Sequence, residues 1–151
     1  MKLANALSQR SDVQNRLGEL RGRLTNNARV QEGEEPAEDP KVLLAELDTL
    51  TAQLEDLVAR INLTNATTVA ADGVTLTAKL ARRDALKEKL GLMRSFLDAA
   101  SNLAGRTMRT EIKVKPTVPV AMLQKQADAL SKELRELDEQ IQELNWTTEL
   151  R

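Results

Sequence analysis

The sequence predicts a mainly α-helical protein: an antiparallel four-helix bundle of two long helical hairpins, with a short β-hairpin and one extra short strand. Two leucine-rich seams carry this prediction, because apolar residues spaced alternately four and three apart lie on one helix face and pack against a neighbouring helix. The first seam comprises Leu43, Leu47, Leu50, Leu54, Leu57 and Ile61. The second seam comprises Leu123, Ala127, Leu130, Leu134, Leu137, Ile141 and Leu144.

The first predicted helix covers about residues 2–31 and has a less regular seam. Arg10 and Gln14 interrupt it, and the register is expected to slip by one between Leu7 and Val13. Its apolar positions are Leu3, Leu7, Val13, Leu17, Leu20 and Leu24.

The other three helices have clearer boundaries. An acidic loop ends at Asp39, a preferred N-cap residue, and Pro40 suits the first helical position, so the second helix is expected over about 40–62. The third helix is expected over about 77–104 and the fourth, opened by Pro119, over about 119–145. The apolar face of the third helix is assigned to Leu80, Leu86, Leu90, Met93, Leu97, Ala100 and Ala104.

Two segments carry β signals. Asp72 and Gly73 stand between β-branched residues, which predicts a hairpin over about 67–76. Residues 109–115 alternate polar and apolar, which predicts a strand. In an up-down-up-down bundle these segments lie at opposite ends. The strand therefore pairs with a neighbouring chain or remains an unpaired extended loop.

Composition narrows the function. The 151 residues form one domain with 22 basic and 23 acidic residues and a net charge of −1, so no charge excess favours nucleic acid. The absence of His and Cys removes the commonest general base and the commonest soft-metal ligands. We therefore expect no enzyme activity, no cofactor and no His or Cys metal site; an all-oxygen Mg²⁺ or Ca²⁺ site stays open. Without a signal sequence or a long apolar run, the cytoplasm is the expected compartment and membrane association is not expected.

Five polar or aromatic residues are candidates for a ligand site: Asn62, Asn65, Arg83, Glu111 and Trp146. Asn62 and Asn65 follow the first seam, where they either bind a polar ligand or cap the helix. Arg83 falls near a seam and binds an anion or forms an ion pair with Glu111, Asp84 or another carboxylate. Trp146 stacks on a ligand or anchors the C-terminal tail.

Several motifs stand in order along the chain: Met1–Ala4, Val30–Pro36, Asp39–Pro40, Ile61–Asn65, Arg83–Asp84, Glu111–Lys113 and Gln142–Trp146. Together they resemble a bacterial family labelled septicolysin. The resemblance implies a pore-forming cytolysin and assigns no catalytic or binding residues. The helices, however, are too charged to span a membrane as single helices. Their wide apolar faces and the unpaired strand favour instead a self-associating scaffold or interaction protein that forms a homo-oligomer, with ligand or anion binding and membrane activity as alternatives.

Overall fold

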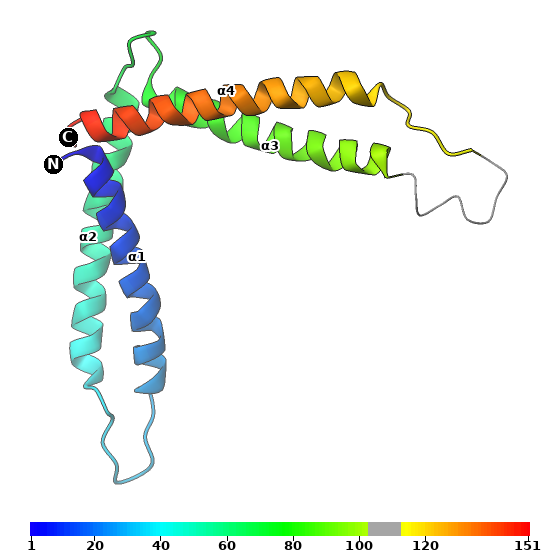
Figure 1. Cartoon of the computed structure of the whole chain (residues 1–151). Helices are drawn as coiled ribbons and strands as arrows, with labels where there is room; N and C mark the ends of the chain where they lie inside the picture. Colours follow the sequence, from blue (N-terminus) through cyan, green and yellow to red (C-terminus); the bar gives the residue numbers. More distant parts are fainter. Residues whose placement is uncertain (103–112) are drawn as a thin grey trace. The chain divides into compact units, whose positions relative to one another are not determined.

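The computed structural model describes residues 1–102 and 113–151, and this part of the chain contains four α-helices (Figure 1). They are α1 (Leu3–Asn26), α2 (Pro40–Thr67), α3 (Leu76–Ser101) and α4 (Val120–Thr147). The chain divides into two compact units instead of one bundle. The first unit is Met1–Val69 with Leu144–Arg151, and the second is Ala70–Glu143.

The predicted β elements are wrong: the described residues contain no strand, and the predicted hairpin is a tight turn. The Gly73 N–H donates to the Ala70 carbonyl and the Ala70 N–H donates to the Val74 carbonyl, each at 2.9 Å. Gly73 has φ 80°, a left-handed conformation that glycine adopts without steric cost. The outermost residues of the predicted hairpin belong to helices: α2 continues to Thr67 and α3 begins at Leu76. Of the second predicted strand, residues 113–115 have no regular structure and residues 109–112 lie outside the described part.

In the first unit, α1 packs along α2 through seams that are regular in both helices. The α1 seam keeps the alternating three-four spacing throughout, so the predicted register slip is wrong. It passes through Ala6, with Leu7 beside it, and Arg10 occupies a seam position. The buried or half-buried seam residues of α1 are Leu3, Ala6, Arg10, Val13, Leu17, Leu20, Leu24 and Asn27.

Polar contacts close the loop between α1 and α2. Asp39 caps α2 by accepting from the Lys41 N–H at 2.9 Å, as predicted from the Asp-Pro pair. Arg23 forms a two-pronged contact with Glu38, its shortest distance being 2.7 Å, and also reaches Glu46 at 3.1 Å. The Arg23 guanidinium holds the pKa of the Glu38 carboxyl below its ordinary value. The buried Asn27 side chain accepts from the Glu38 N–H at 2.9 Å and thereby fixes the end of the loop.

The two chain ends lie together in the first unit. Lys2 and Glu149 form an isolated antiparallel bridge, and the Leu3 N–H donates to the Thr148 carbonyl at 2.9 Å. The buried Thr64, one step beyond the predicted seam of α2, accepts from the Arg151 N–H at 3.0 Å through its hydroxyl. The C-terminal residues are therefore held to the N-terminal residues by backbone hydrogen bonds and to α2 through the Thr64 hydroxyl.

In the second unit, α3 and α4 pack around a core formed by Leu90, Leu97 and Ala127. The seam of α3 begins differently from the prediction, because Lys79 is buried where the sequence favoured Leu80. With Lys79 and Arg83 counted, the spacing alternates three and four from Leu76 onward. The seam residues of α3 are Leu76, Lys79, Arg83, Leu86, Leu90, Met93, Leu97 and Ala100.

Candidate functional site

The most unusual residue of the second unit is Lys79, a lysine on the packing face of a helix hairpin. Its side chain is 6% exposed. Its ammonium donates to Asp72 Oδ2 at 2.6 Å and to Gln140 Oε1 at 2.9 Å. A buried charge is costly unless it is paired and hydrogen-bonded, and here a carboxylate from the turn before α3 and an amide from α4 provide that compensation.

Asp72 is held in place from two sides. Its side chain accepts from Lys79 and, through Oδ1, from the Val74 N–H at 3.1 Å. These hydrogen bonds hold the pKa of the Asp72 carboxyl below its ordinary value, since both favour the charged form. The residue therefore remains an anion well into the acidic range and keeps Lys79 paired.

A cavity of about 310 Å³ opens beside this ion pair. Its wall combines basic and acidic groups with apolar surface. Of the lining residues, Arg82 pairs with Glu133, whereas Glu136 has a long contact of 3.8 Å with the exposed Lys132. The lining residues are Asp72, Val74, Ala78, Lys79, Arg82, Glu133, Glu136, Leu137 and Gln140.

The α3/α4 hairpin has two different sides, which follow from helix periodicity and the contacts between the helices. The Arg82–Glu133 pair marks one side. The hydrogen bond from Arg94 to Ser131, at 3.2 Å, marks the other. Residues seven apart lie on the same side of packed helices. Phe96 therefore lies on the side of Arg82.

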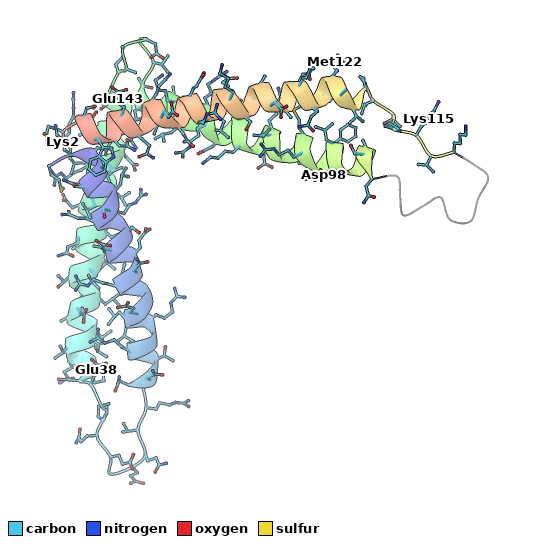
Figure 2. All side chains as sticks on the ribbon, viewed as in Figure 1. Lys2, Glu38, Asp98, Lys115, Met122 and Glu143 are labelled. Carbon is cyan, nitrogen blue, oxygen red and sulfur yellow. The ribbon has the colours of Figure 1, made fainter. Side chains whose placement is uncertain are left out.

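We call the outer part of the Arg82 side the apolar flank. On α3 it carries Leu92, which is 64% exposed, and Phe96, which is 47% exposed. On α4 it carries Met122, 54% exposed and close to the start of the helix (Figure 2). One charged residue, the exposed Lys89, lies on the same side, seven residues after Arg82 and seven before Phe96. The flank consists of Leu92, Phe96, Ala99, Met122, Gln126 and Ala129.

The opposite side, the polar flank, is rich in charge. It carries Arg94 and Asp98 on α3 and Asp128 and Arg135 on α4. Arg83 reaches Asp138 at 4.0 Å on this side and Asp84 at 2.9 Å. The hairpin thus has one side suited to water and one side with exposed apolar side chains.

In the first unit, Arg10 is the notable polar seam residue. Its Nε atom is buried and has no hydrogen-bond partner among the described residues. Elsewhere in this unit, a cavity of about 440 Å³ is lined by ion-forming side chains from both helices. Those side chains are Asp12, Arg16, Asp56 and Arg60.

The five residues predicted for a ligand site do not fall in one described unit. Asn62, Asn65 and Trp146 belong to the first unit, whereas Arg83 belongs to the second. Glu111 lies outside the described residues. Asn62 is exposed and lies within α2, not after its end, and Trp146 is 62% exposed.

The sequence interpretation missed Lys79 and Asp72. The signal for Lys79 was its position, seven residues before Leu86 and three after Leu76. A charged residue in a heptad position is easily passed over in favour of an adjacent leucine, here Leu80. Asp72 was read only as part of a hairpin turn, although the same turn places it beside the first turn of α3.

Two further observations concern the described part of the chain. None of its helices combines the length and the apolar character needed to cross a membrane. Among residues 1–102 and 113–151, no group of three or more acidic residues could hold a metal ion.

The described helices form two hairpins, with the half-buried Arg10 in the seam of α1 and the buried Lys79 in the seam of α3. The chain belongs to a family of unknown function (DUF6847), whose profile matches residues 10–150. It is also similar to a solved structure described as a functionally unknown conserved protein from Corynebacterium diphtheriae. That structure shares 45% sequence identity, with a TM-score of 0.93 over 100% of this chain and 99% of the other. No curated protein matches, and none of these comparisons carries the septicolysin name.

Proposed function

We propose that the protein is a non-enzymatic interaction protein that self-associates through the apolar flank of the α3/α4 hairpin. The observation that carries the proposal is the exposure of Leu92, Phe96 and Met122 on one side of the hairpin. Aromatic residues and Met are enriched in the centres of protein–protein interfaces, where charged residues are depleted. The apolar flank has this composition and the polar flank does not.

The geometry of the hairpin favours a second helical layer. Two helices that pack only on each other need apolar residues in a narrow seam. In the second unit that seam is occupied by core residues such as Leu90 and Leu97. Phe96 on α3 and Met122 on α4 are exposed apolar residues outside this seam, which is typical of helices that contact more than one neighbour.

We assign the covering layer to a second copy of the chain. Closed two-fold symmetry is the commonest arrangement of soluble oligomers, and it places the same patch of each subunit against the other. The six residues of the apolar flank are uncharged, so pairing them brings no like charges together within the flank, and the exposed Lys89 lies beside them. Two hairpins joined in this way form a four-helix bundle between subunits.

Sedimentation velocity at micromolar concentration tests the proposal. The wild-type protein is expected to sediment with twice the 16.7 kDa mass of one chain. The double substitution Phe96→Glu with Met122→Glu places charges in the interface and is expected to give a monomer, with helicity by circular dichroism unchanged. Val42→Glu is the matched control, because Val42 is an exposed apolar residue of the first unit. A wild-type monomer, or equal masses for wild type and the double variant, would contradict the proposal.

A further inference from the structure

We infer that the cavity beside Lys79 binds a small zwitterion, a molecule with one carboxylate, one ammonium group and a short apolar portion, as in a free amino acid. The first reason is an unused donor. An ammonium group has three N–H donors, and Asp72 and Gln140 accept two of those of Lys79. No described residue accepts the third, and Lys79 lines the cavity.

The surroundings of Lys79 favour an anionic group at that donor. Lys79 lies in the first turns of α3, which begins at Leu76, and the N-terminal end of a helix carries partial positive charge. Asp72 is the one carboxylate in contact with the ammonium, and Arg82 lines the same cavity. A ligand carboxylate would receive the third hydrogen bond and reduce the cost of the buried charge.

The acidic part of the lining calls for a positive group on the same ligand. Glu133 is already paired with Arg82, whereas Glu136 is exposed and has only its 3.8 Å contact with Lys132. A simple anion would be repelled by these carboxylates. A zwitterion places its ammonium group toward Glu136 and its carboxylate toward Lys79.

The remaining wall and the size of the cavity set the third feature of the ligand. Val74, Ala78 and Leu137 contribute apolar surface. The volume of about 310 Å³ lies at the lower end of the range for small-molecule sites, which suits a compact molecule over a large cofactor. The cavity lies within the second unit, so this inference does not depend on self-association.

An NMR titration of the full-length protein with L-leucine tests the inference. We expect saturable shifts of the Val74 and Ala78 amides and of the Gln140 side-chain amide. Two analogues separate the recognised groups: 4-methylpentanoate lacks the ammonium group and isopentylamine lacks the carboxylate. Each is expected to bind at least about tenfold more weakly, the change that corresponds to one lost interaction of about 1.4 kcal/mol.

Matched variants locate the site. Glu136→Gln is expected to weaken leucine binding at least about tenfold, whereas Glu139→Gln, a change of the same type outside the cavity lining, leaves binding unchanged. Lys79→Met removes the ammonium group that binds the ligand carboxylate and is expected to abolish binding. If this variant does not fold, Glu136→Gln and the two analogues test the inference without it. The absence of saturable shifts, equal binding of the three compounds, or equal effects of the two glutamate substitutions would overturn the inference.

Discussion

Replacing Arg10 by leucine is expected to make the protein more stable. Arg10 occupies a seam position of α1 between Ala6 and Val13, and its buried Nε donor has no partner among the described residues. Residues on a packing face normally contribute apolar contact. A charged residue without a partner at such a position loses hydration and receives no hydrogen bond in return.

The magnitude follows from two contributions. An unsatisfied buried donor costs about 1–3 kcal/mol, and because Arg10 as a whole is only half-buried, we take the lower end of that range. A fully buried leucine contributes about 1.5–3 kcal/mol, but the position is half-buried and the methylene groups of the arginine already cover part of the surface. Helix propensity hardly differs between the two residues. We therefore expect a net gain of about 1–2 kcal/mol.

Urea unfolding followed by circular dichroism measures this gain as a higher midpoint with an unchanged slope. In thermal unfolding, each kcal/mol corresponds to a rise of about 2–4 °C for a chain of this size. Arg21→Leu is the control, because Arg21 is exposed on the same helix and its replacement should change stability by less than about 0.5 kcal/mol. The reasoning is refuted if Arg10→Leu destabilises the protein or if the two substitutions have the same effect.

Three further predictions concern stability. Lys2 and the chain's N-terminal ammonium lower the pKa of Glu149 below its ordinary value of 4.5, so the stabilisation by this carboxylate is present above that pH and is lost as the pH falls through the lowered pKa. Glu149→Gln should therefore lower the melting temperature at pH 7 and have no effect at the acidic end of a pH series; an equal effect at both ends would contradict this. Leu50→Ala should cost about 3 kcal/mol in urea unfolding because Leu50 is 1% exposed, whereas the half-exposed Leu44 should tolerate the same change at below about 1 kcal/mol. Asp39→Ala removes the N-cap of α2 and should cost about 1 kcal/mol, and a neutral result would show that the cap is not used in solution.

The helices were predictable because their seams are long and regular. The seams of α2 and α4 consist of apolar residues at nearly every step, so spacing alone located both helices. In α1 and α3, the sequence interpretation assigned a seam position to the nearest leucine. It chose Leu7 where the small residue Ala6 is buried, and Leu80 where the polar residue Lys79 is buried. The structure keeps the spacing regular, because a lysine can be buried when Asp72 and Gln140 compensate its charge.

The prediction of a β-hairpin and the prediction of a single ligand site failed for a different reason. An Asp-Gly pair specifies a turn, but it does not determine whether the residues on either side pair as strands or join helices. Here Thr75 caps α3 by accepting from the Ala78 N–H at 3.2 Å, and the helix takes up the following residues. Asn62 and Arg83 belong to different compact units, and the division of the chain into two units is a property of tertiary packing that spacing does not show.

The central claim, self-association through the apolar flank, has a direct test because the chain contains no cysteine. A spin label attached at Gln126→Cys reports on the apolar flank, and one at Gln124→Cys reports on the polar flank of the same helix. Pulsed electron paramagnetic resonance then measures distances between copies. We predict a discrete intermolecular distance for the label at position 126 that is shorter than the distance at position 124. The absence of intermolecular coupling at position 126, or a shorter distance at position 124, would contradict the claim.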